Sequence, residues 1–308
     1  MKLIHFSKIK KIDKGIVLGI GKFDGVHSGH QKILEIVVKE AEEKGRVAGV
    51  VTLRKFPVEF LLCPWEEKLS LLKEAGMELC IWCDFGEISH LSAEEFLDIL
   101  LTAEVKTIVV GYNFHFGKGR KGDVKFLRKQ SKEKGFSLIV VPSYKKKGEV
   151  VSASKIRRMI KSGDIEKANK LLGRYFSVSG KVVKGKGIGK KIGFPTANLA
   201  LENNICIGEG VYAGWAVYKK GTYKAAIVTG KSPTFNDNIN KFEVFLIDFP
   251  YKKDIYNEKV DVFLYKKIRG QRKFQDIESL KKQIEKDIQK IKILLKEFSF
   301  LRKNSYKV

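Results

Sequence analysis

The chain has 308 residues, 44% of them hydrophobic, and a formal net charge of +25. This length favours two domains, each able to bury a core. No stretch approaches the roughly 20 apolar residues that span a bilayer, and the N-terminus lacks the apolar core of a signal peptide. Four cysteines in no framework pattern suit a reducing compartment. We therefore expect a cytoplasmic protein that does not interact with membranes.

The basic charge does not by itself identify a partner. A basic surface attracts polyanions, but the lysines are scattered among acidic residues and are not gathered with aromatic residues into a nucleic-acid-binding module. A solvated lysine-rich surface is the simpler interpretation, and it also suits ligands that carry several phosphates. We expect no nucleic-acid partner and a monomer or weak homo-oligomer, and keep a nucleic-acid-binding protein as the remote alternative.

The first 175 residues alternate short apolar runs with amphipathic stretches. This alternation predicts a Rossmann-like α/β domain, in which a doubly wound parallel sheet has helices on both faces. Ligands of such sheets bind beyond the carboxyl ends of the strands, at the switch point. Cys80 and Cys83 fall within one predicted strand and should face opposite sides, which argues against a redox pair. The expected strands are 16–20, 47–53, 79–83, 107–111 and 137–141, and the expected helices include 30–44, 92–101 and 124–134.

The segment 16–34 combines a buried strand, a glycine loop and a helix start, a geometry that gathers backbone N–H groups for a phosphate. His27 and His30, three residues apart in the first turn, point the same way. Imidazoles can donate to phosphate oxygens and, when protonated, offset charge on a leaving pyrophosphate. A surface pair of histidines is the plainer alternative. The pattern resembles the signature of the nucleotidylyltransferase superfamily, which implies nucleotide contacts at Gly21, Phe23, Asp24, Gly25 and Gly29.

A second glycine-rich loop, Gly111 to Asp123, begins where another predicted strand ends. Asn113 could bond a ribose or a base edge, and Phe114 or Phe116 could support a ring. The alternative is a turn with its phenylalanines in the core. The sequence Gly-Tyr-Asn-Phe-His-Phe-Gly resembles the corresponding loop of the prokaryotic bifunctional riboflavin kinase/FAD synthetases.

The segment Ser152-Ala-Ser-Lys-Ile-Arg-Arg158 continues this resemblance. Ser152 is a candidate N-cap, and Ser154, Lys155 and Arg157 would then face a triphosphate. A capped basic helix without a ligand is the alternative. The sequence departs from the family after the second strand, where Arg54-Lys-Phe-Pro57 replaces a Pro-His-Pro-like stretch.

From residue 176 the pattern changes to β-branched and aromatic runs separated by turns. It predicts an antiparallel β-barrel domain, followed by one helix from Gln275 to about Phe300 and a tail at 301–308. The expected strands are 177–183, 211–218, 222–229, 242–249 and 259–266.

The barrel domain contains a glycine- and lysine-rich loop, Lys184 to Gly193, followed by Phe-Pro-Thr-Ala-Asn198. Gly187 and Gly189 would give a flexible flap over phosphates, and the side-chain oxygens of Thr196 and Asn198 could meet Mg²⁺ or a phosphate. Alone, such a segment is usually an ordinary loop. Followed by Gly-Phe-Pro-Thr-Ala-Asn, it resembles the riboflavin kinase family.

Further segments agree with that family in order and spacing. The strand Phe242 to Phe249 resembles the one that carries its catalytic glutamate, which corresponds to Glu243; a solvent-facing glutamate is the alternative. Ser232–Phe235 resembles a family turn, and the segment holding Arg269 and Phe274 resembles one that closes over flavin. Thr229 and Asn257 stand where the family has Asn and Tyr-Gly.

The resemblance implies two activities on one chain. A domain at 176–300 would phosphorylate riboflavin to FMN with MgATP, and a domain at 1–175 would adenylylate FMN to FAD with release of pyrophosphate. The partners would be ATP, riboflavin and FMN, with Mg²⁺ as cofactor. The nearer alternative is that only one of the two activities is retained.

Overall fold

The structure is a computed structural model that describes residues 1–146, 148–201, 205–232, 237–250 and 255–296. The chain divides into two compact units. Unit 1 consists of Met1–Glu59 and Cys63–Ser152, and unit 2 of Phe60–Leu62 and the chain from Ala153 onward. The predicted tail at 301–308 and residues 233–235 of the predicted turn lie outside the described residues.

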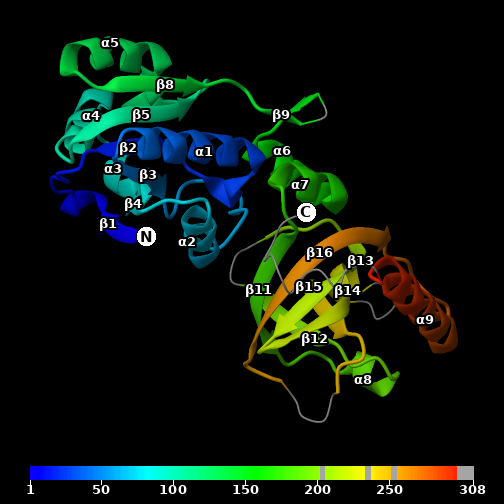
Figure 1. Ribbon diagram of the computed structural model, residues 1–308. Coiled ribbons are helices and arrows are strands. Elements are labelled where there is room, and N and C mark those ends of the chain that lie inside the picture. Colours follow the sequence, from blue (N-terminus) through cyan, green and yellow to red (C-terminus); the bar gives the residue numbers. More distant parts are fainter. Residues whose placement is uncertain (147, 202–204, 233–236, 251–254, 297–308) are drawn as a thin grey trace. The chain divides into compact units, whose positions relative to one another are not determined.

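Unit 1 is built on a sheet in which every strand pairing is parallel (Figure 1). Five of its strands coincide with the predicted apolar runs. The edge strand β1 was not predicted, because its four residues are only partly buried and carry no apolar run. The order is β1 (Lys2–His5), β4 (Leu79–Cys83), β3 (Val47–Leu53), β2 (Ile16–Ile20), β5 (Val105–Gly111) and β8 (Ser137–Val141).

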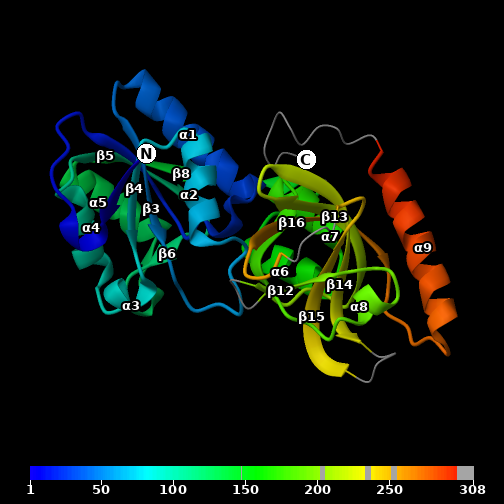
Figure 2. The same ribbon diagram turned by 90° about the horizontal axis from the view of Figure 1, so that it is seen from below.

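Helices cover both faces of this sheet, as predicted, and Figure 2 shows α1 and α2 on one side and α4 and α5 on the other. A hydrophobic core lies on each face of the sheet, and successive strand residues point alternately into one and the other. Val50 and Cys80 face α1 and α2, while Val51 and Cys83 face α4 and α5. The two cysteines thus lie on opposite faces, as predicted, and this placement argues against a redox pair. The helices are α1 (Ser28–Glu43), α2 (Trp65–Glu74), α3 (Phe85–Ile88), α4 (Ala93–Leu101) and α5 (Val124–Lys134).

The switch point lies between β2 and β5, which are adjacent although β3 and β4 intervene in sequence. The glycine loops after β2 and β5 therefore leave neighbouring strands at the same edge, as the sequence predicted. Short elements complete unit 1: strands β6 (His115–Phe116), β7 (Gly122–Asp123), β9 (Lys145–Lys146) and β10 (Glu149–Val150), and 3-10 turns at Phe6–Lys8, Asp24–Val26 and Lys118–Arg120.

Unit 2 is a closed barrel in which every strand pairing is antiparallel. Two helices precede it, α6 (Ala153–Ser162) and α7 (Ile165–Leu172), and α9 (Ile277–Leu294) packs on β13 and β14. Around the barrel the order is β11 (Phe176–Val183), β12 (Ala197–Leu201), β15 (Asp237–Leu246), β14 (Gly221–Ser232), β13 (Gly210–Tyr218) and β16 (Lys259–Arg269).

Three details of unit 2 differ from the sequence-based expectations. Strand β12 was not predicted, and the glycine flap contains one helical turn, α8 (Ile188–Lys191). In addition, α6 and α7 group with the barrel, although the predicted domain boundary lies after them at 175. The buried amide of Asn169 accounts for this grouping of α7, because its nitrogen donates to the Leu264 carbonyl (2.8 Å) and its oxygen accepts from the Phe176 N–H (2.7 Å).

Candidate active sites

The loop after β2 adopts a backbone that most side chains avoid. Phe23 and Val26 have φ of 44° and 38°, in the left-handed region, and Gly25 has φ of 68°. The Phe23 ring is completely buried, and a Cβ at Gly21 would lie 3.3 Å from it. A contact from Phe23 to a nucleotide would therefore use its backbone. This loop leads directly into the first turn of α1.

His27 and His30 form one stacked pair at that turn. Their ring centroids are 3.6 Å apart with an interplanar angle of 13°, and His27 Nδ1 accepts a hydrogen bond from the His30 backbone N–H at 3.2 Å. Because Nδ1 of His27 is an acceptor, its ring proton resides on Nε2 in this arrangement. A Cβ at Gly29 would lie 3.3 Å from the His27 ring, so a side chain at this position would crowd the pair.

His30 is held in its uncharged form. Burial lowers the pKa of the imidazole well below its ordinary value, and the nearby His27 and Lys68 lower it further. Its Nδ1 is buried and has no hydrogen-bond partner among the described residues. Of the two uses that the sequence suggested for these histidines, hydrogen bonding fits this environment, whereas neutralisation by a protonated His30 does not.

The loop after β5 has two different parts. Asn113 is exposed, and its backbone carbonyl oxygen lies 2.9 Å from His115 Nδ1. Phe114 stacks on Phe116 (5.3 Å between centroids, 18° between planes) and packs against the core on the α4 and α5 face. The sequence left open whether Phe114 lies in the core or supports a ring; the ring packs against the core but is only partly buried.

The residues predicted to bind the triphosphate lie where the two units join in sequence. Ser152 is the last residue of unit 1, and Ser154, Lys155 and Arg157 lie in the first turns of α6 in unit 2. Arg157 Nε donates to the Phe60 carbonyl at 2.8 Å. The arginine thus holds the segment Phe60–Leu62, which belongs to unit 2 although the chain on either side of it belongs to unit 1.

The barrel brings its predicted site residues together around one cavity of about 490 Å³. Thr196 Oγ1 approaches Glu243 Oε2 at 3.4 Å, and Asn198 is directly opposite Glu243 in the β12–β15 pairing, so both side chains lie on one face. A Cβ at Gly189 would collide with the Phe194 carbonyl and lie 3.2 Å from Thr196 Oγ1, which explains a glycine in the flap. The lining includes Gly187, Gly189, Thr196, Asn198, Glu243, Arg269 and Phe274.

Sequence reasoning missed the side chains of α9 that hold the segment after β16. Arg269 Nε donates to Asp287 Oδ2 at 2.8 Å, and Gln283 Nε2 donates to Asp287 Oδ1 at 2.8 Å. Arg272 donates to Gln283 and lies 4.8 Å above the Phe274 ring. A sequence signal existed: Asp287 interrupts the apolar stripe of α9, and an acid there needs a partner.

Two departures from the family pattern have local explanations. Asn257 has φ of 64°, in the left-handed region that asparagine tolerates better than most side chains, so it can stand where the family has glycine. Thr229 is buried, and its hydroxyl donates to the Gly208 carbonyl at 2.7 Å. Both residues are therefore accommodated by the barrel backbone.

Fold and site define a class: a Rossmann-like unit with a paired-histidine loop, followed by a barrel whose cavity holds a glutamate, a threonine and an asparagine. The FAD synthetase family model matches residues 9–155, and the riboflavin kinase family model matches residues 172–295. The chain belongs to the bifunctional riboflavin kinase/FMN adenylyltransferase family and contains both of its domains. The family, the fold class and the presence of both enzyme domains were predicted from the sequence, and these predictions are confirmed.

Relatives of this family match along nearly the whole chain. The bifunctional riboflavin kinase/FMN adenylyltransferase of Buchnera aphidicola (subsp. Schizaphis graminum) is 35% identical, covering 95% of this chain and 98% of the relative. The enzyme of Bacillus subtilis is 34% identical, covering 98% of this chain and 100% of the relative. The enzyme of Escherichia coli is 33% identical, covering 89% of this chain and 91% of the relative. The similarity thus includes both units.

A solved structure supports the same architecture. The crystal structure described as a macrolide-efflux protein from Streptococcus pneumoniae has a TM-score of 0.82 and 28% identity, covering 93% of this chain and 97% of that one. Efflux is a description of that protein. In the present chain, none of the described helices combines the length and apolarity that a membrane crossing requires.

Proposed function

We propose that this chain makes FAD from riboflavin in two steps, one in each domain. The barrel phosphorylates riboflavin to FMN, and the Rossmann-like domain transfers AMP from ATP to FMN. The observation that carries the proposal is the convergence of Glu243, Thr196 and Asn198 with the glycine flap on one cavity, since a kinase needs a base, oxygen donors and a phosphate cover at one place.

In the barrel, Glu243 accepts the proton of the terminal ribityl hydroxyl as that oxygen attacks the γ-phosphate of ATP. A strand-borne carboxylate suits this role because the sheet fixes its position relative to the hydroxyl. Gly187 and Gly189 allow the flap to cover the phosphates with backbone N–H groups, and Arg269 and Phe274 border the flavin. The γ-phosphoryl group moves from ATP to the flavin oxygen, ADP leaves, and FMN results.

The donor set fits Mg²⁺. Thr196 and Asn198 offer oxygen atoms, which this ion prefers, and the described residues contain no cluster of three or more His, Cys, Asp or Glu that would form an all-protein cage. We therefore assign the ion to Thr196 and Asn198 together with ATP phosphates. When bound, it neutralises charge that develops on the transferred group.

In the Rossmann-like domain, the phosphate of FMN attacks the α-phosphate of ATP, and pyrophosphate leaves. The chain needs no nucleophile of its own here, because FMN supplies one. His27 and His30 donate hydrogen bonds to phosphate oxygens whose charge grows during transfer. The family resemblance, and not the placement of the two units, is the basis for assigning triphosphate binding to Ser152, Ser154, Lys155 and Arg157. Gly21, Phe23, Asp24, Gly25 and Gly29 shape the nucleotide loop, Asn113 contacts the nucleoside, and Phe114 borders the flavin.

The decisive experiment follows flavins over time in a mixture of the purified chain, riboflavin, ATP and Mg²⁺, separated by chromatography. FMN that rises and then gives way to FAD is the expected result. FMN alone would show that only the kinase is active, and FAD formed only from supplied FMN would show the reverse. The absence of both products would refute the proposal.

The four cysteines, all within the described residues, form no disulfide, which suits the reducing cytoplasm in which we place this reaction.

A further inference from the structure

Lys68 is a completely buried lysine that the reactions above do not use. It lies on α2 and is 1% exposed, although a lysine is rarely buried unless its charge is compensated. Its Nζ donates to the Leu53 carbonyl at 2.9 Å and to the Lys22 carbonyl at 3.0 Å. One acceptor is the last residue of β3, and the other lies in the glycine loop after β2. Lys68 therefore ties together the carboxyl ends of two neighbouring strands.

The carbonyl that Lys68 holds immediately precedes the left-handed turn. Lys22 is followed by Phe23, with φ of 44°, and its carbonyl oxygen also accepts from the Thr52 hydroxyl at 2.8 Å. Left-handed backbone at a bulky residue is strained and persists only where its surroundings hold it. Two buried donors on one carbonyl are such a restraint. The turn they hold leads into His27 and His30.

The surroundings of Lys68 are consistent with a buried ammonium group. The Phe56 and Trp65 rings each lie 5.7 Å from Nζ, and ring faces attract cations. Burial lowers the pKa of Lys68, whereas the nearby Cys63, Asp24 and Cys80 act in the opposite direction. The two carbonyl acceptors further favour the protonated amine, which alone offers three donors.

We propose that Lys68 is a positioning residue of the adenylyltransferase site, which locks the left-handed loop Gly21–Val26 and so aligns His27 and His30 for phosphate binding. This inference rests on the function proposed for the two histidines.

The positive charge of Lys68 has a second effect, on the protonation of His30. Burial is the largest cause of the lowered pKa of His30, and His27, at the start of α1, and Lys68, on α2, lower it further. The ammonium group therefore also helps to keep His30 an uncharged hydrogen-bond donor.

The test is Lys68→Met in the full chain, with FMN-to-FAD and riboflavin-to-FMN turnover measured on the same preparation. We expect kcat for FAD formation to fall about a hundredfold, as for a catalytic group displaced by about 1 Å, with a smaller change in KM. FMN formation in the barrel should match the unmodified chain. Lys73→Met is the matched control, since Lys73 lies on the same helix but is exposed, and it should leave both rates unchanged.

The pH profile separates a positioning role from simple destabilisation. Without the ammonium group the pKa of His30 rises, so protonation removes its neutral form at a higher pH. The acidic limb of FAD formation should therefore move to higher pH in Lys68→Met and Lys68→Gln, and Lys68→Gln should retain more activity because its amide still donates a hydrogen bond. Unchanged kcat and an unmoved limb would overturn the proposal.

A variant at Thr52 keeps the proposal testable if Lys68→Met does not fold. Thr52→Val removes the other donor to the Lys22 carbonyl while keeping the side-chain shape, and it should lower FAD formation several-fold without moving the acidic limb. Full activity of Thr52→Val would refute the restraint. His30→Ala separates the two levels of inference: if it makes FAD normally, the role of the histidines is wrong, whereas a normal Lys68→Met beside an inactive His30→Ala refutes only the role of Lys68.

Discussion

The barrel site and the histidine loop offer opposite chemistry to their substrates. The barrel cavity presents a carboxylate, Glu243, beside the side-chain oxygens of Thr196 and Asn198. The loop presents two stacked imidazoles, of which His30 is kept uncharged by burial and by its neighbours. The difference follows the proposed reactions: a hydroxyl must lose a proton to attack, and so needs a base, whereas the phosphate of FMN is already an anion and needs only donors around the transition state.

The largest expected effect tests the base in the barrel. Glu243→Gln keeps the side-chain shape and an oxygen for Thr196 but cannot accept a proton. We expect FMN formation to fall by about 10²–10⁴-fold, the usual contribution of a general base, while FAD formation from supplied FMN is unchanged. Both rates are measured by chromatography of the flavins. Near-normal FMN formation would remove Glu243 from the reaction and leave the cavity as a binding site alone.

The next effect tests the donors in the loop. His30→Ala removes a hydrogen bond that strengthens as charge develops on the phosphates, so we expect kcat for FAD formation to fall by about 10²–10³-fold. FMN formation should be unaffected. His90→Ala is the matched control, because His90 is an exposed histidine of the same unit. If His30→Ala lost activity only at alkaline pH, the imidazole would be acting as a base, and the contrast between the two sites would disappear.

A smaller effect is expected from a change at Asp287, the carboxylate that pairs with Arg269 at the barrel cavity. Asp287→Asn leaves Arg269 without its carboxylate partner, although the segment after β16 stays in place through other contacts. We expect the KM for riboflavin to rise roughly tenfold, equivalent to about 1.4 kcal/mol, with little change in kcat or in FAD formation. Glu285→Gln, at an exposed position of the same helix, is the control. Equal kinetics for the two variants would show that Arg269 needs no partner to border the flavin.

Sequence reasoning predicted most of what lies within continuous motifs. The strands of unit 1 are short apolar runs. The barrel residues lie in a few local patterns, and it was the resemblance of these patterns to one family that implied a shared site. The edge strand β1 lacks such a run, and the start of β12 was interpreted as part of the glycine-flap motif, so both strands were missed. The alternation of cores was also predictable, as Cys80 and Cys83 show.

What sequence could not provide is the environment of single side chains. Lys68 looks like any lysine of a basic chain, and only the fold reveals that it is buried beneath the histidine loop. The neutrality of His30 depends on burial and on neighbours from two helices, neither of which is encoded in His-x-Gly-His. The assignment of Phe60–Leu62 to unit 2 arises from contacts far apart in sequence.

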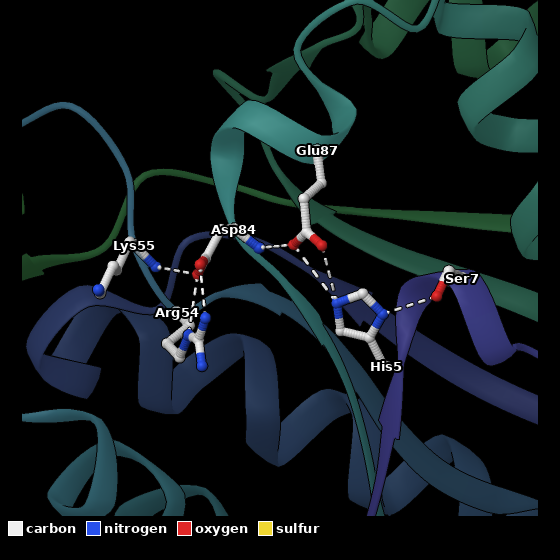
Figure 3. A network of polar contacts seen from close by, with 6 residues as sticks. All are labelled: His5, Ser7, Arg54, Lys55, Asp84 and Glu87. Atoms are coloured by element: carbon white, nitrogen blue, oxygen red, sulfur yellow. Dashed lines mark hydrogen bonds and ion pairs between the residues drawn. The ribbon is translucent and has the colours of Figure 1, made fainter.

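The smallest expected effect concerns the loop that departs from the family, Arg54-Lys-Phe-Pro57. Figure 3 shows its anchor: Arg54 makes a bidentate pair with Asp84 at 3.0 and 2.6 Å, and the Lys55 N–H donates to Asp84 at 3.1 Å. Nearby, Glu87 accepts from the Asp84 N–H and pairs with His5. The Arg54 guanidinium lowers the pKa of Asp84. The two side chains are 38% and 26% exposed, so solvent screening limits the pair to about 0.5–1 kcal/mol.

The pH dependence gives this last effect a sign. Because the pKa of Asp84 is depressed in the folded state, its contribution is complete above the unfolded value and is lost as pH falls through the folded one. We expect Asp84→Asn to lower the midpoint of thermal unfolding slightly at pH 7, and the difference from the unmodified chain to vanish at strongly acidic pH. An undiminished difference there would mean that the substitution acts through lost geometry at the Lys55 N–H, not through lost charge. The loop holding Phe56 would then be fixed by hydrogen bonding, as the Gly21–Val26 loop is by Lys68.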